Sequence, residues 1–140
     1  MICADQQDYK NAFKKHLHAY TNWGVTGSGT SRRLILIYCV ECGLKSLLMK
    51  QQRIYRVADA QPHIVNEFYS HDFYRLLKSL NQAGIYSFPP ISTIHGDRVR
   101  PDTYHQLCRY SVRIAENHQG LVNQYDGQLE KIAEWLREQV

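Results

Sequence analysis

SRRLILIYCVECGLKSLLMK, residues 31–50, is the longest mainly apolar run in this chain of 140 residues. Its hydrophobic side chains recur every three or four positions from Leu34 to Leu48, which is typical of a helix. The first half alone also fits a buried strand, but the length of the whole run favours a helix. We place this helix at residues 32–50, after a Ser31 N-cap. It is apolar over most of its circumference, so we expect it at the centre of a bundle.

Four further helices are expected on either side of this run, each with one apolar face. They begin near Tyr9, Ser70, Pro101 and Asn123 and end near Trp23, Gly84, His118 and Glu138. Polar or proline-containing connections separate them, of which residues 88–96 are expected to form a surface loop. The expected fold is therefore all-α, an antiparallel helical bundle of four to five helices that forms a single domain over residues 1–140.

The chain carries a formal net charge of +4 and seven histidines. This charge favours anionic partners only mildly, because dedicated nucleic-acid modules are usually more basic. The histidines titrate near neutral pH and can add positive charge or acid–base capacity. No signal peptide follows Met1, and the central run contains Glu41 and Lys45 and is too short to cross a bilayer. We therefore expect a cytoplasmic protein that does not enter a membrane.

The four cysteines are expected to be reduced thiols, because the sequence shows no secretory signal. Cys39 and Cys42 have CxxC spacing, but no second CxxC motif or paired histidine motif accompanies them. On a helix two such thiols fit core packing as well as redox chemistry, and we favour core packing. His16 and His18 point in nearly opposite directions on a helix and do not suit one metal ion. We expect neither a metal site nor a cofactor.

Two motifs resemble those of the HEPN superfamily. Glu41-Cys-Gly-Leu-Lys45 lies on the expected central helix, and Ser70-His71-Asp72 opens the next one, similar to the E-x-x-L-K helix and later H-D start of that family. HEPN domains are small helical bundles that often dimerise, and many are metal-independent endoribonucleases. The resemblance therefore implies an RNA-acting protein that forms a homodimer.

The HEPN ribonucleases carry an arginine and a histidine separated by four to six residues. Arg113-Ile-Ala-Glu-Asn-His118 has this spacing and is our first choice for a catalytic pair, and Arg100-Pro-Asp-Thr-Tyr-His105 is the second. Such a pair can cleave RNA without a metal. The histidine accepts the proton of the ribose 2′-OH, and the guanidinium offsets the charge of the phosphorane.

Leu107-Cys-Arg109-Tyr110-Ser111 resembles instead the arginine–tyrosine step of non-catalytic HEPN proteins, some of which partner nucleotidyltransferases. In this interpretation Arg109, Tyr110 and Arg98 bind RNA or a nucleotide, with aromatic rings stacked on unpaired bases. Glu41 and Lys45 lie four residues apart on one helix face. They form a structural ion pair or line the same cleft.

Three functional hypotheses follow. The first is a ribonuclease effector of a toxin–antitoxin or antiviral defence system, with Arg113 and His118 as its catalytic pair and an antitoxin as partner. The second is a non-catalytic module that binds RNA, a nucleotide or a partner nucleotidyltransferase through Arg109 and its neighbours. The third is a helical interaction scaffold with no ligand chemistry, since a fold does not imply a function.

Overall fold

The computed structural model describes residues 3–24 and 26–140. This part of the chain contains five α-helices: α1 (Gln6–Thr21), α2 (Gly29–Gln51), α3 (Phe73–Ser79), α4 (Tyr104–Arg109) and α5 (Gln119–Gln139). The connections hold the 3-10 helices η1 (Val57–Asp59), η2 (Val65–Tyr69), η3 (Ala83–Ile85) and η4 (Glu116–His118) and an antiparallel pair of strands, β1 (Ile91–Ser92) and β2 (Arg98–Val99). The predicted all-α class is confirmed. Among these helices, none has both the length and the apolar character needed to span a bilayer.

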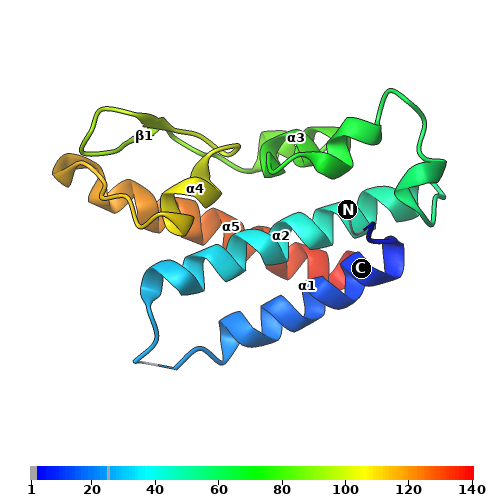
Figure 1. The fold of residues 1–140 in the computed structure, drawn as a ribbon, viewed down its shortest axis with the longest axis horizontal. Helices are drawn as coiled ribbons and strands as arrows, with labels where there is room; N and C mark the ends of the chain where they lie inside the picture. The colour runs from blue at the N-terminus through cyan, green and yellow to red at the C-terminus, as the bar shows by residue number, and fades with distance from the viewer. Residues whose placement is uncertain (1–2, 25) are drawn as a thin grey trace.

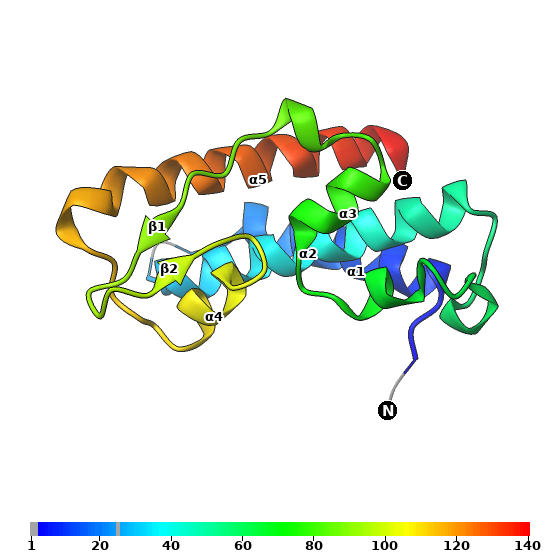
Figure 2. The ribbon, with the colours of Figure 1, turned by 90° about the horizontal axis from the view of Figure 1, so that it is seen from above.

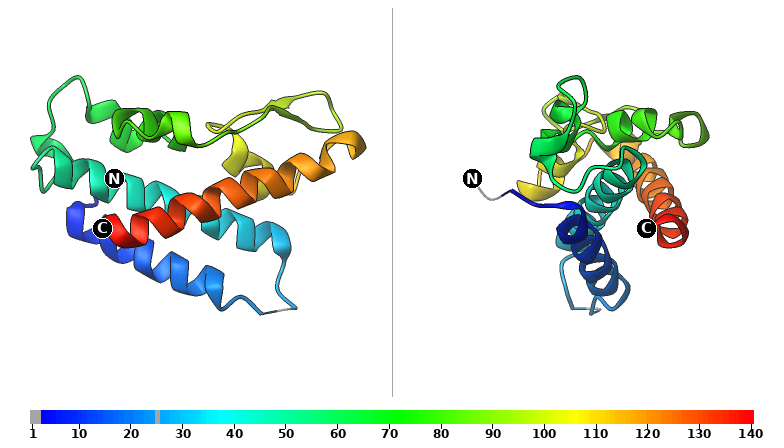
Figure 3. Two further views of the ribbon diagram at one scale, coloured as in Figure 1. Left: turned by 180° about the vertical axis from the view of Figure 1, so that it is seen from behind. Right: turned by 90° about the vertical axis from the view of Figure 1, so that its right-hand side faces the viewer.

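Helix α2 is the central element of the fold (Figure 1). Helices α1 and α2 form an antiparallel hairpin, and α5 packs across α2 beside them (Figures 1 and 3). The short helices α3 and α4 and the strand hairpin lie on the opposite side of α2 from α1. Most of α2 from Leu36 to Met49 is buried, as expected for a helix at the centre of the bundle.

Gly43 lets the three long helices approach one another closely. A Cβ atom at this position would lie 2.7 Å from a methyl carbon of Leu136 in α5 and 2.8 Å from the ring of Phe13 in α1. Glycine inside a helix costs about 0.5–1 kcal/mol relative to alanine. Close packing of α1 and α5 against α2 offsets that cost.

Helix α2 continues through the residues that also fitted a strand, so the strand alternative is wrong. It begins at Gly29, before the predicted start, because Ser28 rather than Ser31 is the N-cap. The hydroxyl oxygen of Ser28 accepts a hydrogen bond from the Ser31 backbone N–H at 3.2 Å. The long apolar run therefore determines a single helix, while its first turn depends on the cap.

Helix α4 is much shorter than predicted. It begins at Tyr104, after the turn that contains Pro101, and ends at Arg109 instead of near His118. The chain leaves the helix at Ser111, whose φ is 51°. The prediction of one helix over this whole region was therefore wrong.

Residues 113–115 pair with the strand hairpin instead of continuing the helix. The N–H of Ile94 donates to the carbonyl of Arg113 at 2.9 Å, and the N–H of Ala115 donates to the carbonyl of Ser92 at 2.9 Å. The expected surface loop over residues 88–96 thus contains β1, which lies between α5 and β2 (Figure 2). Tertiary pairing has overridden the helical periodicity of this segment.

Two other helix boundaries also differ from the prediction. The N-cap of α3 is Asp72 rather than Ser70, because the Asp72 carboxylate accepts the backbone N–H groups of the first turn. Helix α3 ends at Ser79, before Gly84, and α5 begins at Gln119, before the predicted residue 123.

Three helices end in the same way. After α2, α3 and α4, a residue other than glycine adopts a positive φ, namely Arg53 at 57°, Asn81 at 59° and Ser111 at 51°. The next backbone N–H then donates to a carbonyl five residues earlier, as from Ile54 to Met49 at 3.0 Å. This is the Schellman arrangement, in which glycine is the usual residue.

Asp126 of α5 holds α4 in place. Its carboxylate accepts a hydrogen bond from the Tyr104 hydroxyl at 2.8 Å and forms an ion pair with Arg33 of α2 at 2.7 Å. Burial raises the pKa of Tyr104, so its hydroxyl remains a donor over the ordinary pH range. The network fixes α4 where α2 and α5 cross, and thereby positions the side chains that α4 carries.

Candidate functional site

Glu41, His71 and His105 meet between α2, the start of α3 and α4, and we call them the acid–imidazole cluster. Oε2 of Glu41 lies 3.2 Å from Nδ1 of His71. The rings of His71 and His105 lie 4.6 Å apart between centroids. Glu41 and His105 are buried, whereas the His71 side chain is 49% exposed. The cluster therefore presents one imidazole to solvent, backed by a buried carboxylate and a buried second imidazole.

Local structure positions each member of the cluster. Glu41 lies in the middle of the buried helix α2, and His105 lies in the first turn of α4. His71 directly precedes Asp72, the N-cap of α3. The cap fixes the backbone at the point where the chain enters the helix, so His71 is held at the junction of these elements.

The hydrogen bond between Glu41 and His71 determines which nitrogen of His71 carries a proton. An ionised carboxylate can only accept, so the 3.2 Å contact requires the proton on Nδ1. In the neutral form of His71, Nε2 then has a free lone pair and can accept a proton. Glu41 therefore orients His71 as a base or, once protonated, as a cationic donor.

Burial disfavours the charged forms of two residues near Glu41 and His71, namely His105 and Lys45. It lowers the pKa of His105, and the nearby His71 lowers it further while Glu41 opposes the shift. It also lowers the pKa of Lys45, again with Glu41 opposing. Among the described residues, Oε1 of Glu41 and Nδ1 of His105 have no hydrogen-bond partner. Unpaired buried polar atoms cost about 1–3 kcal/mol each, so a water molecule or a ligand group that reaches these two atoms would be bound favourably.

Arg109 extends the cluster along the same two helices. It lies four residues after His105 on α4, so the two side chains share a face. Its Nη2 donates to the hydroxyl of Tyr38 at 3.0 Å, and Tyr38 precedes Glu41 by one turn of α2. After burial and His71, the charge of Arg109 also lowers the pKa of His105. An exposed guanidinium that is hydrogen-bonded to α2 therefore adjoins the acid–imidazole cluster.

Three predicted site residues therefore come together here, Glu41, His105 and Arg109, with the exposed Tyr110 following Arg109. The structure does not pair Glu41 with Lys45. Among the described residues Glu41 forms its ion pair with His71 instead, and Lys45 forms none within 4.0 Å.

The first-choice catalytic pair, Arg113 and His118, lies by the strand hairpin and the start of α5. Arg113 is exposed. Nδ1 of His118 accepts the backbone N–H of Ser92 at 2.9 Å, so the proton of the neutral ring is on Nε2. No hydrogen bond or ion pair joins Arg113 to His118 among the described residues. The catalytic role of this pair stays a prediction.

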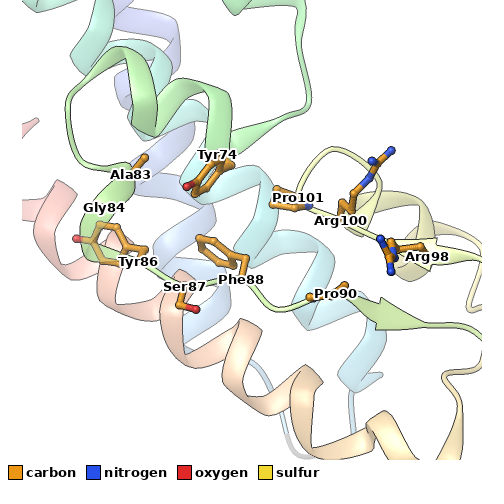
Figure 4. A pocket seen from close by; sticks show the side chains of 10 residues that line it. All are labelled: Tyr74, Ala83, Gly84, Tyr86, Ser87, Phe88, Pro90, Arg98, Arg100 and Pro101. Carbon is orange, nitrogen blue, oxygen red and sulfur yellow. The ribbon is translucent and has the colours of Figure 1, made fainter.

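Arg98 and Arg100 lie at a separate pocket of about 520 Å³ between α3, η3 and the strand hairpin (Figure 4). Tyr74, Tyr86 and Phe88 line one side, and the two arginines line the other. In Figure 4 the guanidinium of Arg98 extends toward the rings, whereas the Arg100 side chain extends away. We call this the aromatic–arginine pocket. The second-choice pair is thus divided, with Arg100 at the pocket and His105 in the acid–imidazole cluster.

The CxxC cysteines belong to the helix core. Cys39 is buried and Cys42 is partly buried, and both are free thiols. Burial raises the pKa of Cys39 to about 12 and that of Cys42 to about 11, so neither is a thiolate at neutral pH. Core packing, as predicted for this motif, is confirmed for Cys39. Within residues 3–24 and 26–140, no group of three or more histidine, cysteine or acidic side chains is arranged to hold a metal ion.

Comparisons with models of known protein families, with characterised proteins and with solved structures give no match for this chain. The HEPN resemblance therefore rests on the sequence motifs and on a helical fold that is compatible with it.

His71 is the member of the cluster that sequence analysis did not name as a site residue. The Ser70-His71-Asp72 motif was interpreted as a HEPN-like start of a helix, and no role was assigned to His71 itself. A signal was present, because this motif and Glu41 are the two features that carry the HEPN resemblance. Their direct contact across 30 residues of sequence could be recognised only from the fold.

Proposed function

We propose that this chain is a HEPN-like protein that binds RNA or a nucleotide, and that a phosphate of its ligand contacts Arg109 and His71. The observation that carries the proposal is the contact between Glu41 and His71, with Arg109 hydrogen-bonded to Tyr38 nearby. It joins the two motifs behind the HEPN resemblance, and Arg109 of the arginine–tyrosine step lies on the same helix as His105.

The chemistry of these side chains suits a phosphate group. The planar guanidinium of Arg109 offers donors that match two phosphate oxygens, and its contact with Tyr38 limits the entropy lost on binding. His71 adds a second donor in its protonated form and is half exposed. Glu41 lies behind His71 and is buried, so His71 rather than the carboxylate meets the ligand.

Tyr110 favours single-stranded over double-stranded RNA as the ligand. Its side chain follows Arg109 and is 64% exposed. An exposed tyrosine ring beside an arginine can stack on an unpaired base, a contact worth about 1–3 kcal/mol, whereas bases in a duplex are not accessible.

Fluorescence anisotropy with a short labelled single-stranded RNA tests the proposal. We expect salt-sensitive binding to the wild-type protein, and a dissociation constant about tenfold higher for Arg109→Ala. Arg56→Ala is the matched control, since Arg56 is equally cationic, highly exposed and outside the cluster. Absence of binding, or equal losses in both variants, would contradict the proposal.

A second candidate function, metal-independent RNA cleavage, is favoured by one specific observation. His71 has a free Nε2 in its neutral form and lies beside His105, which burial keeps neutral. In this reaction His71 takes the proton of the 2′-OH, and the 2′ oxygen attacks the phosphorus. The bond to the 5′ oxygen then breaks, and this oxygen takes the proton back from His71, directly or through water, leaving a 2′,3′-cyclic phosphate and a 5′-hydroxyl. Arg109 would offset the charge on the phosphorane.

Such an enzyme would suit the predicted role in a toxin–antitoxin or antiviral defence system, with an antitoxin or nucleotidyltransferase as its partner. Incubation of the same RNA with the protein in EDTA separates the two candidates. Cleavage that leaves cyclic phosphate ends and disappears in His71→Gln supports the enzyme. Binding without cleavage supports the non-catalytic module.

A further inference from the structure

The aromatic–arginine pocket has the size and lining of a ligand site. Its volume of about 520 Å³ lies within the range of roughly 300–1,000 Å³ typical of small-molecule sites. Its described lining contains three aromatic rings, two prolines and two arginines, and no carboxylate. An apolar surface that faces cationic side chains favours a ligand with a flat apolar part and an anionic part.

Phe88 forms a rigid surface in this pocket. Its ring packs at 5.0 Å against Phe73 and at 5.0 Å against Tyr125, both fully buried, and Tyr74 meets it edge-on at 6.3 Å. The core rings hold Phe88 from behind, so it lines the pocket in a fixed orientation. A planar group could stack there with little loss of side-chain entropy.

Arg98 supplies an unpaired charge on the opposite side. It belongs to β2 and is paired through its backbone with Ser92 of β1. Its side chain is exposed and forms no ion pair among the described residues, and its guanidinium extends toward the aromatic side (Figure 4). Arg100 adds a second charge at the rim, where it contacts Asp102 only loosely at 3.8 Å.

We propose that the aromatic–arginine pocket binds one nucleotide unit, with the base stacked on Phe88 beside Tyr74 and the phosphate held by Arg98. The unit is either a free nucleotide or an unpaired residue of an RNA strand, which share this chemistry. The choice of nucleic acid over an acidic peptide follows from the fixed ring surface, which a peptide carboxylate does not require.

This inference rests on the proposed function in one respect, because it connects the aromatic–arginine pocket with the acid–imidazole cluster. Pro101 lines the pocket, and His105 of the acid–imidazole cluster follows it by four residues. The same turn therefore separates the pocket from the cluster. We therefore expect a single RNA strand to contact both sites when its base occupies the pocket.

Isothermal titration with AMP tests the pocket on its own. We expect AMP to bind the wild-type protein, and adenosine and ribose 5-phosphate each to bind at least about tenfold more weakly, because each lacks one half of the recognition. Arg98→Ala should weaken AMP binding about tenfold and Tyr74→Leu about fivefold. Tyr74 is only half-buried, so Tyr74→Leu remains informative even if a Phe88 variant does not fold. Arg56→Ala, at an exposed arginine outside both sites, should leave AMP affinity unchanged.

A titration with short single-stranded RNA distinguishes the two proposals and the two sources of the nucleotide. RNA affinity should fall in both Arg98→Ala and Arg109→Ala if a strand occupies both sites. AMP binding that is lost in Arg98→Ala, with RNA binding insensitive to Arg109 and His71, supports the pocket and overturns the proposed function. RNA binding that depends on Arg109, with no AMP binding and no effect of Arg98→Ala, overturns the pocket alone. Ribose 5-phosphate binding as tightly as AMP would also overturn it, because the base would then contribute nothing.

Discussion

Nδ1 of His71 lies 3.2 Å from Oε2 of Glu41, a contact between residues 30 positions apart in the sequence. The contact ties the most buried helix of the fold to the entrance of α3. It also gives a buried carboxylate its single hydrogen-bond partner among the described residues.

Removal of His71 should therefore lower stability by leaving Glu41 buried and unpaired. We expect His71→Ala to cost about 1 kcal/mol in urea unfolding, a modest figure because the half-exposed His71 side chain is screened by water. His63→Ala, at an exposed histidine elsewhere, should change stability by less than about 0.5 kcal/mol. Equal losses in the two variants would show that the contact does not contribute.

Stability should fall in mildly acidic solution because of His105. Burial lowers its pKa in the folded protein below the unfolded value of about 6.5. At acid pH the unfolded chain therefore binds more protons, so stability is fully present above about pH 6.5 and decreases below it. Thermal unfolding of wild-type protein and His105→Gln at about pH 7.5 and 5.5 checks this. The variant should lose less stability between the two pH values, and an unchanged pH dependence would assign the effect to other groups, such as His16.

Gly43→Ala should destabilise the bundle, although alanine is the better helix former. The new methyl group would overlap Leu136 and Phe13, and overpacking of this kind costs about 1–3 kcal/mol. Gly127→Ala in α5 is the matched control, because a Cβ there meets nothing within 4 Å and should add about 0.5–1 kcal/mol. The two variants are thus expected to shift the urea midpoint in opposite directions.

An RNA cleavage assay on single variants should show whether His71 or the pair Arg113 and His118 is catalytic. The structure gives His118 a structural contact with the Ser92 N–H, so His118→Ala should lower the melting temperature as well as any activity. His71→Gln should abolish cleavage. Activity that survives in His71→Gln but disappears in Arg113→Ala would identify Arg113 and His118 as the catalytic pair after all.

The protein should form a homodimer, as the HEPN resemblance implies. Ile94 is exposed, and its backbone N–H donates to the carbonyl of Arg113, so its side chain adjoins the basic segment that a symmetric dimer would bring together. We expect sedimentation velocity to show a dimer and Ile94→Asp to weaken it, while Ile85→Asp at a separate exposed isoleucine does not. A wild-type protein that is monomeric at high micromolar concentration would contradict this expectation.

The long helices could be predicted because each contains many apolar residues that repeat the same helical spacing. Over 20 residues or so, one substitution or one misplaced cap does not change the periodicity, so α1, α2 and α5 were recognised with errors only at their ends. The segment after Arg109 gave a weaker signal. It has helical spacing, but Val112 and Ile114 are β-branched, and pairing with β1 decides its conformation. Such long-range pairing has no local signature.

The sequence predicted individual residues of the candidate site, but it did not predict that they lie next to one another. Glu41, His105 and Arg109 were named from separate motifs, and only the packing of α4 against α2 shows that they adjoin. That packing depends on Asp126, which pairs with Arg33 and Tyr104 and belongs to none of those motifs.

The three residues with positive φ that follow α2, α3 and α4 are positions at which substitution by glycine should stabilise the protein. A residue with a Cβ pays about 1–2 kcal/mol to adopt this conformation, and asparagine tolerates it best. Arg53→Gly and Ser111→Gly should therefore each raise the melting temperature, with a smaller gain for Asn81→Gly. The three positions follow different helices, so their gains should add. A triple variant would be a robust background in which destabilising substitutions at the buried cluster could still be purified and assayed.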